Sequence, residues 1–328
     1  MRHSDARGAT GRGSECRGRG SRAEEDTVKL TTRLAALSAA MFIAAACGGG
    51  GASGAPTQAS TQGAVSQAPA SVLPTQVTIA PPTSLIKAGT LTDCVDIEYP
   101  PMEFFPPDVT DPQEAIGFDV DAARAVADRL GLAIEIRNTG FSALIQDLGA
   151  GRCDIVWSGL YISADRLKVG DAVPYMATGQ VLMVPAGNPL GISQESDLCG
   201  KTISIQGGGV VQQRAEAANA ACETAGSEPI EIRPFDKVAD EFAQIVTDRV
   251  DAVWETDTAV LNFRFDHPEY EVAYELPRDD RYGVYYTKGK TDLGDALEAA
   301  IAALQDDGTL AALATQYSMD PAILDFAE

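Results

Sequence analysis

The sequence is poor in the residues that most enzymes use for catalysis. It contains two histidines, and His267 is the only one beyond residue 46. No Ser/His/Asp or Cys/His constellation is apparent, no Gly-x-x-x-x-Gly-Lys-Ser/Thr motif occurs, and no Cys-x-x-Cys pair marks a zinc site. We therefore expect no metal and no cofactor, and we predict that the protein is not an enzyme.

Positive charge is also scarce. The chain has 25 Lys and Arg against 47 Asp and Glu, a formal net charge of −22. Residues 1–46 hold eight of the basic and five of the acidic residues, which leaves 17 basic against 42 acidic residues in the remainder. Because nucleic-acid binding needs Lys and Arg to neutralise phosphates, this charge balance argues against a nucleic acid as partner.

Long hydrophobic runs are limited to the N-terminal region, and none is long enough to span a bilayer. Lys29 and Arg33 precede the apolar stretch 34–43, and three alanines lead to Cys47. This order is typical of a secretory signal, and the position of the cysteine resembles a bacterial lipobox. We predict that residues 1–46 are a leader and lipoprotein signal peptide and that Cys47 is lipidated on the outer face of the membrane. An ordinary signal peptide with a chance cysteine is the alternative.

Residues 47–84 are rich in Gly, Ala, Ser, Thr, Gln and Pro and lack apolar periodicity. Such a segment cannot bury a core, so we predict a disordered tether between the lipid anchor and a folded domain.

Four cysteines remain beyond this tether, an even number in an oxidising compartment. Cys94 and Cys153 each begin an apolar strand in the first half, whereas Cys199 and Cys222 lie 23 residues apart in one strand–helix unit. Among three possible pairings we predict the disulfides Cys94–Cys153 and Cys199–Cys222. Four buried free thiols are the alternative.

From residue 91 the apolar pattern alternates between strands and helices. It predicts strands over 91–97, 132–137, 153–158, 180–185, 201–206, 228–234, 249–254, 272–276 and 284–287. It predicts helices over 119–130, 141–149, 209–225, 239–247, 257–265, 292–305 and 309–317. We therefore expect an α/β fold of two Rossmann-like lobes with largely parallel sheets, joined by two hinge strands.

The apolar strands near 180–185 and 272–287 are the candidate crossings between these lobes. We place residues 85–184 and 277–328 in lobe 1 and residues 185–276 in lobe 2. Hinged lobes that close over a ligand are a known switching mode.

Arg166 is the most informative candidate for ligand binding. The apolar stretch 155–157 runs into Ser158 and Gly159, and Ser163 then stands as a cap before Arg166. A strand end, a turn and a helix start meet there, where α/β folds commonly bind ligands, and a guanidinium fits a carboxylate bidentately. A surface arginine in a first helical turn is the alternative.

Other candidates follow predicted strands. The glycines at 207–209 precede a helix, so their backbone N–H groups could bind an anion, or they form a flexible turn. Tyr99 and Phe141 each follow a strand at the ligand end of the first unit, although both could be core residues. Asp96 lies at a strand tip, where it could accept a cation or cap a turn.

Further motifs occur in a consistent order over residues 91 to about 317. They are Asp96–Phe104, Gly117–Asp121 with Ala125–Leu130, Phe141–Ile145, Ile162–Arg166, Pro174–Leu182, Asp197–Lys201, Arg249–Val253 and Asp307–Leu310. Together they resemble the family 3 periplasmic solute-binding proteins, the polar amino-acid binders of ABC importers; Ala122 departs from the bulkier residue usual there. The resemblance implies the type II periplasmic binding protein fold. It also implies a monomer that captures a small zwitterion, most simply an amino acid, and delivers it to the permease subunits of an importer.

The resemblance also implies a ligand site. Arg166 would clamp the ligand α-carboxylate, Tyr99 and Phe141 would sandwich the ligand side chain, and Asp96 would face its far end. The other residues of the site would be Ser158, Gly159, Tyr161, Gly208, Gly209, Val210, Thr256 and Asp257.

Three positions depart from the family pattern. Tyr161 replaces a small hydroxyl residue, and Gly209 and Val210 replace threonines, which leaves only backbone donors. The acid that usually holds the α-ammonium falls on Thr256. Either a one-residue shift supplies Asp257 instead, or the ligand is not an ordinary L-amino acid.

Two other functions are compatible with the same scaffold. A cyclohexadienyl dehydratase-like enzyme would need a general acid in the cleft, for which Glu98 is a candidate, but the scarcity of histidine and the lipobox argue against it. A ligand-sensing module usually has a following transmembrane helix, and none is found before Glu328.

Overall fold

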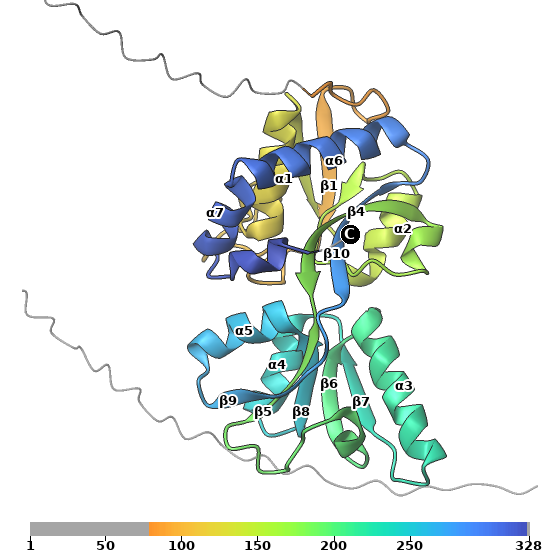
Figure 1. Cartoon of the computed structure of the whole chain (residues 1–328), viewed down its shortest axis with the longest axis vertical. Coiled ribbons are helices and arrows are strands. Elements are labelled where there is room, and N and C mark those ends of the chain that lie inside the picture. Colours follow the sequence, from red (N-terminus) through yellow and green to blue (C-terminus); the bar gives the residue numbers. More distant parts are fainter. Residues whose placement is uncertain (1–78, 327–328) are drawn as a thin grey trace, which may run out of the picture. The chain divides into compact units, whose positions relative to one another are not determined.

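The computed structural model describes residues 79–326, which form two α/β lobes, each built on a five-stranded sheet (Figure 1). The predicted leader, the lipidation site Cys47 and residues 47–78 of the predicted tether lie outside the described residues. Within residues 79–326, no helix is long and apolar enough to cross a membrane, and no cluster of His, Cys, Asp and Glu side chains could hold a metal ion.

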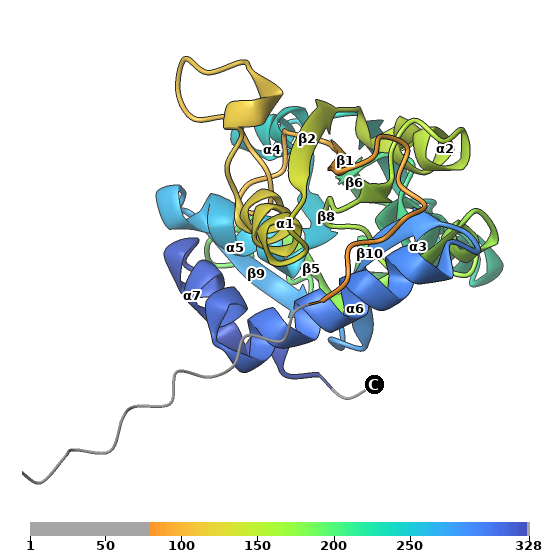
Figure 2. The ribbon, with the colours of Figure 1, turned by 90° about the horizontal axis from the view of Figure 1, so that it is seen from above.

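The first lobe has the strand order β2-β1-β3-β10-β4. Its strands are β1 (Thr90–Val95), β2 (Ala133–Asn138), β3 (Ile155–Val156), β4 (Gly170–Thr178) and β10 (Asp280–Thr287). Its helices are α1 (Phe118–Arg129), α2 (Leu144–Gly149), α6 (Thr291–Asp306) and α7 (Thr309–Gln316). The helices α1, α6 and α7 pack on one another, while α2 packs separately against β1, β3, β4 and β10 (Figure 2). Strand β1 is parallel to β2 and β3, and β10 is antiparallel to β3 and β4.

The second lobe has the strand order β7-β6-β8-β5-β9. Its strands are β5 (Gln180–Pro185), β6 (Thr202–Gln206), β7 (Glu231–Phe235), β8 (Ala252–Thr256) and β9 (Tyr270–Glu275). Its helices are α3 (Val210–Thr224), α4 (Val238–Val246) and α5 (Asp257–Asp266). Strand β6 is parallel to β7 and β8, and β5 is antiparallel to β8 and β9. The carboxyl ends of the parallel strands in each lobe are therefore the expected location of a ligand.

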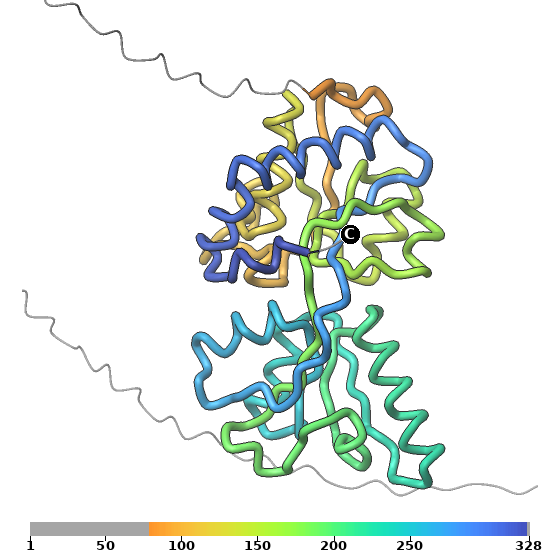
Figure 3. The backbone as a smooth tube through the Cα atoms, in the orientation of Figure 1, coloured from red at the N-terminus to blue at the C-terminus, as the bar shows by residue number. Residues whose placement is uncertain are grey.

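The chain crosses between the two sheets twice, from β4 to β5 at Gly179 and from β9 to β10 through residues 276–279 (Figure 3). Two crossings were expected, but the boundary predicted at residue 184 is five residues too late. Because β5 pairs with β8 and β9, it belongs to the second sheet. Strand β4 is not predicted by the apolar pattern, since Pro174 lies within it. The pairing with β10 shifts register beside this proline, where Tyr175 of β4 has no partner between Met176 and Pro174.

The predicted tether also ends earlier than residue 84. The backbone N–H groups of Thr83 and Ser84 donate to Asp292 Oδ2 at 2.8 and 3.0 Å, near the start of α6. Ile79 packs against the main core. Residues 79–84 are thus part of the folded lobe, held by contacts to a residue more than 200 positions away that no local pattern reveals.

Both predicted disulfides are present, Cys94–Cys153 with a Cα–Cα distance of 5.8 Å and Cys199–Cys222 with 5.6 Å. The first joins the end of β1 to the turn before β3. The second joins the segment before β6 to α3. Each disulfide therefore ties together elements whose ends reach the space between the lobes.

Gly117 fixes the start of α1 against the loop that carries Tyr99. Its φ of +132° lies in a region that favours glycine, and a Cβ there would lie 2.2 Å from the carbonyl oxygen of Met102. The Asp119 N–H donates to that same carbonyl at 2.9 Å. A larger residue would separate α1 from this loop, so glycine is required here.

Candidate functional site

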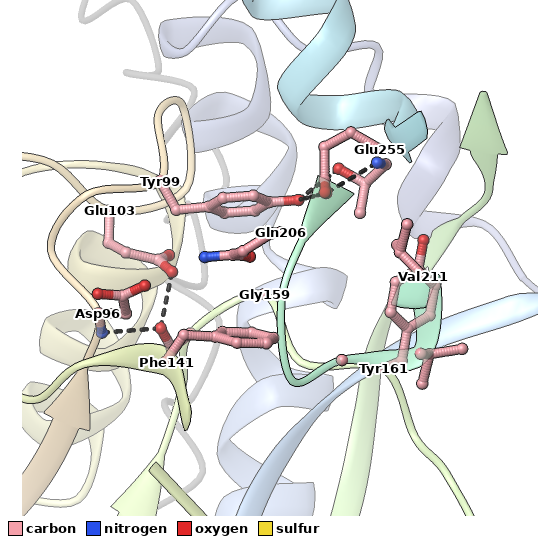
Figure 4. Close-up of a pocket in the computed structure, with 13 residues that line it drawn as sticks. Asp96, Tyr99, Glu103, Phe141, Gly159, Tyr161, Gln206, Val211 and Glu255 are labelled. Carbon is pink, nitrogen blue, oxygen red and sulfur yellow. Dashed lines mark hydrogen bonds between the residues drawn. The ribbon is translucent and has the colours of Figure 1, made fainter. Parts of the chain in front are cut away.

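A cavity lies between the two lobes at the carboxyl ends of β1, β3, β6 and β8 (Figure 4). The space inside it that a water-sized group can occupy is about 20 Å³, so the described conformation is nearly closed. The first lobe contributes Asp96, Tyr99, Glu103, Phe141, Ser158, Gly159 and Tyr161, and the second contributes Gln206, Gly209, Val210, Val211, Glu255 and Thr256. Nine of the twelve predicted site residues line it; Arg166, Gly208 and Asp257 do not.

The two predicted aromatic residues reach this cavity from different loops of the first lobe. Tyr99 lies in a turn closed by its own N–H donating to Glu103 O at 2.8 Å, and Phe141 begins a short 3-10 helix before α2. In the view of Figure 4 the Gln206 amide lies between the two rings. A flat ligand group would stack between these aromatic faces only after the Gln206 amide moved aside.

Tyr99 also connects the lobes. Its hydroxyl contacts Thr256 Oγ1 and lies 3.4 Å from Glu255 Oε1 in the second lobe, and 3.2 Å from the Tyr282 hydroxyl. The described conformation is therefore one in which a first-lobe side chain completes the second-lobe wall.

Ser158 and Gly159 are held at the tip of β3 by buried carboxyl groups. The Ser158 hydroxyl donates to Glu103 Oε1 at 2.7 Å and accepts the Asp96 N–H at 3.0 Å. The Gly159 N–H donates to Asp119 Oδ2 at 2.7 Å, and the Tyr175 hydroxyl donates to the same oxygen. Ser158 and Gly159 thus form hydrogen bonds within the first lobe that order this wall of the cavity.

Among residues 79–326, three carboxyl groups line the cavity, and no Lys, Arg or His does. Asp96 is 5% exposed, and Glu103 and Glu255 are each 1% exposed. Burial raises the pKa of Asp96 to about 7, with a further rise from Glu98, and burial raises the pKa of Glu255 to about 7. Burial, together with Asp119, also raises the pKa of Glu103 well above its usual range. These groups favour a positively charged ligand, because a cation beside them would stabilise their ionised forms.

Arg166 lies beside this cavity rather than in its wall. It begins a 3-10 helix, Arg166–Lys168, and its side chain lines a neighbouring cavity that shares Phe141, Gly209 and Val210 with the first. Its guanidinium lies 5.5 Å from the Phe141 ring centroid, and Nη1 donates to Tyr161 O at 3.0 Å. Gly208 lines the same neighbouring cavity, and its N–H donates to Gln212 Oε1 at 2.7 Å.

Asp257 does not face the cavity. The structure therefore contradicts the one-residue shift by which Asp257 would bind the α-ammonium of the ligand. Its Oδ2 pairs with Arg278 Nε at 2.6 Å, and its Oδ1 accepts the Thr178 hydroxyl at 3.1 Å. These partners hold Asp257 at the two crossings. Thr256 does line the cavity, where its hydroxyl oxygen also accepts the Ala259 N–H and caps α5.

Glu98, the general-acid candidate of the enzyme alternative, does not line the cavity either. It forms an ion pair with Lys237 from the second lobe.

Four lining residues were missed by sequence reasoning: Glu103, Gln206, Val211 and Glu255. Glu103 lies within the motif Asp96–Phe104. Gln206 is the last residue of β6, and Glu255 is the last but one of β8. A polar residue at the end of an apolar strand is the signal that could have identified the latter two.

Comparisons with known proteins agree with this geometry. Residues 91–320 match the family described as bacterial extracellular solute-binding proteins, family 3. The L-cystine-binding protein TcyJ of Escherichia coli is 28% identical over 231 residues, covering 70% of this chain and 82% of that protein. The probable ABC transporter arginine-binding protein ArtJ of Chlamydia trachomatis is 27% identical, with coverages of 68% and 83%.

Solved structures show the same two-lobed architecture. An ancestral arginine-binding protein bound to arginine superposes with a TM-score of 0.64 at 28% identity, covering 70% of this chain and 98% of that chain. The fold is the type II periplasmic binding protein fold, as predicted, and these relatives are named as binding proteins rather than enzymes. The chain therefore belongs to family 3 of the bacterial extracellular solute-binding proteins.

Proposed function

We propose that this protein captures an amino acid with a cationic side chain outside the cytoplasmic membrane and delivers it to an ABC importer. The observation that carries the proposal is the cavity wall, where the described part of the chain places Asp96, Glu103 and Glu255 without any basic residue. A bound cation would be attracted by each of them, whereas an anionic side chain would meet like charges in a desolvated space. Arginine-binding proteins among the relatives support this choice.

Arg166 would hold the α-carboxylate of this ligand. Among the described residues its guanidinium makes one hydrogen bond, to Tyr161 O, so the remaining donors can receive a carboxylate. Because the neighbouring cavity shares Phe141, Gly209 and Val210 with the acidic one, an elongated ligand can extend between them. The proposal thus places the negative end of the ligand at Arg166 and its positive side chain against Asp96 and Glu103.

We also propose that the mature protein is a monomer anchored by lipid at Cys47, with residues 47–78 as the tether to the lobes. The supporting observation is the basic, apolar and small-residue order before Cys47. Replacing Cys47 by Ser should move the protein from the membrane fraction to the soluble extracytoplasmic fraction. A variant that stays in the membrane fraction would contradict lipidation at this residue.

A thermal-shift panel tests the ligand class. L-Arginine, L-lysine and L-ornithine should raise the melting temperature, because a ligand that binds the folded state stabilises it by mass action. L-Citrulline, which has nearly the shape of arginine but a neutral side chain, should give a much smaller shift, as should L-glutamate. A larger shift with citrulline, glutamate or L-cystine than with any basic amino acid would overturn the proposal.

The affinity for a basic amino acid should depend on pH and should be higher at pH 8 than at pH 6. Asp96 and Glu255 have pKa values of about 7 in the ligand-free protein, so they are mostly ionised at pH 8 and mostly protonated at pH 6. A cationic ligand must then displace protons at the lower pH, and its affinity should fall as the pH drops from 8 to 6. Affinity that is equal or higher at pH 6 would argue against ionised carboxyl groups as the cation acceptors.

A further inference from the structure

We infer that Tyr161 is a positioning residue that links the ligand cavity to the crossings between the lobes, and that its hydroxyl group helps to hold the lobes together. Tyr161 takes the place of the small hydroxyl residue of the family pattern, so this role is a departure from that pattern. The inference goes beyond the proposed function, because it holds for any ligand that contacts the Tyr161 ring.

Tyr161 reaches from the cavity to the first crossing. It follows β3, is 4% exposed and lines the cavity from the first lobe (Figure 4). Its hydroxyl donates to Gly179 O at 3.0 Å, and Gly179 is the residue at which the chain passes from β4 to β5. A serine or threonine at position 161 would be too short to reach this carbonyl from the same backbone position. The tyrosine therefore makes a contact with the crossing that a small hydroxyl residue could not make.

Both lobes and both crossings meet at the Gly179 carbonyl. It also accepts the N–H of Asp257, the first residue of α5 in the second lobe, at 3.0 Å. The Asp257 carboxylate pairs with Arg278 of the second crossing at 2.6 Å. A Cβ at Gly179 would lie 3.0 Å from Arg278 Cγ and 3.3 Å from Leu276 O, so the two crossings are in close contact there. Tyr161 is thus the first-lobe member of a junction whose other members belong to the crossings and the second lobe.

A second aromatic side chain fixes the Tyr161 ring. The ring centroids of Tyr161 and Tyr282 lie 5.2 Å apart in an edge-to-face arrangement. Tyr282 lies in β10, shortly after the second crossing. Its hydroxyl lies 3.2 Å from the Tyr99 hydroxyl of the first lobe and 3.1 Å from the Thr258 hydroxyl of the second. The Tyr161 ring therefore cannot turn away from the crossing without disturbing this further connection between the lobes.

The backbone of Tyr161 is connected to the residue proposed to bind the ligand carboxylate. Its carbonyl accepts Arg166 Nη1 at 3.0 Å and the Tyr285 hydroxyl at 2.8 Å. A ligand packed against the Tyr161 ring would restrict that ring to the rotamer whose hydroxyl reaches Gly179. Binding then favours the conformation in which the lobes are together, because the ligand and the hydroxyl contact stabilise the same state.

Small-angle X-ray scattering of the ligand-free protein tests the role of the hydroxyl. Tyr161→Phe keeps the ring and removes only the donor to Gly179 O. The ratio of open to closed protein should rise about 2- to 10-fold, as expected for the loss of one hydrogen bond, and the radius of gyration should increase. Because both proteins have the same N-terminal segment, the difference comes from the lobes. A loss of stability alone would leave the shape of the folded protein unchanged, and an unchanged radius of gyration would overturn the inference.

The rates of L-arginine binding, followed by stopped-flow fluorescence, give a second readout. In Tyr161→Phe, dissociation should be about 2- to 10-fold faster, while association should change by less than about twofold, because the hydroxyl contact forms after the ligand has entered. Unchanged dissociation would count against the role of Tyr161. If wild type binds no basic amino acid, the proposed function fails, whereas the scattering experiment still decides the inference.

Tyr270→Phe is the matched control. Tyr270 is a buried tyrosine of the second lobe whose hydroxyl also donates to a backbone carbonyl, that of Ile245, at 3.5 Å. It does not line the ligand cavity. The variant removes a comparable hydroxyl away from the crossings, so the radius of gyration and both rates should keep their wild-type values. Effects as large as those of Tyr161→Phe would show that the loss of any buried tyrosine hydroxyl is sufficient, and the inference would then be wrong.

Discussion

Replacing Arg166 by Ala should weaken binding of the amino-acid ligand by roughly 1 to 4 kcal/mol, or about fivefold to a thousandfold in Kd. The substitution removes the only arginine among the residues that line the acidic cavity and its neighbour. A ligand carboxylate would then stay in a partly desolvated site without its counter-charge. Titration calorimetry with L-arginine measures the effect directly.

The surroundings of Arg166 explain why the loss should exceed that of a surface charge. The guanidinium lies over Phe141, one of the two rings proposed to cover the ligand, and it is tied to the Tyr161 carbonyl. Its backbone N–H lies 3.4 Å from Ser163 Oγ, which helps to fix the start of the 3-10 helix. The guanidinium of Arg166 is therefore held in place before a ligand binds, which reduces the conformational entropy that is lost on binding.

Two controls define the origin of the effect. Arg152→Ala removes an arginine of the same lobe whose pair with Asp147 is exposed, and it should change affinity by little, as exposed pairs usually do. Arg166→Lys keeps the charge but loses the planar fork, so it should fall between wild type and Arg166→Ala. Wild-type affinity in Arg166→Ala would show that the ligand carboxylate binds elsewhere.

The motifs predict the order of elements well, because each depends on local apolar periodicity and on turn residues. The helix that follows Gly117 and the strand Gln180–Pro185 are examples. The missed strand β4 shows the limit of that signal. Pro174 disfavours a strand locally, yet the register shift beside it, where Tyr175 has no partner, makes the strand compatible with the sheet. The strand that it pairs with there, β10, lies more than a hundred positions away in the sequence.

The candidate site was likewise predictable where its residues depend on the order of strands and loops, and not where they depend on packing. Tyr99, Phe141 and Ser158 follow strands of the first lobe, so topology alone brings them to one edge. Glu255 lies at an equivalent strand end but within the buried run Ala252–Thr256, where sequence cannot tell a core-facing from a cleft-facing position. The neighbouring Asp257 was equally plausible from the sequence. Its pairing with Arg278 depends on how the two crossings pack, which only the three-dimensional structure shows.

Removing the Cys94–Cys153 disulfide should lower the free energy of unfolding by about 4 kcal/mol, whereas removing Cys199–Cys222 should cost about 3.4 kcal/mol. The estimate follows from the chain entropy released when loops with sequence separations of 59 and 23 residues are opened. Urea unfolding of the two double Cys→Ala variants measures the difference. A larger loss for the shorter loop would contradict the entropic explanation.

Loss of the Cys94–Cys153 disulfide should also weaken ligand binding, and loss of Cys199–Cys222 should weaken it less. Cys94 lies two residues before Asp96, and Cys153 lies five residues before Ser158. The Asp96 N–H donates to the Ser158 hydroxyl, which in turn donates to Glu103. Opening the Cys94–Cys153 loop loosens the two strands whose ends carry this hydrogen-bonded wall, while Cys199–Cys222 lies at the far ends of β6 and α3 from the cavity. Folded protein lacking the first disulfide should therefore bind arginine more weakly than folded protein lacking the second, because ordering the acidic wall then becomes part of the cost of binding.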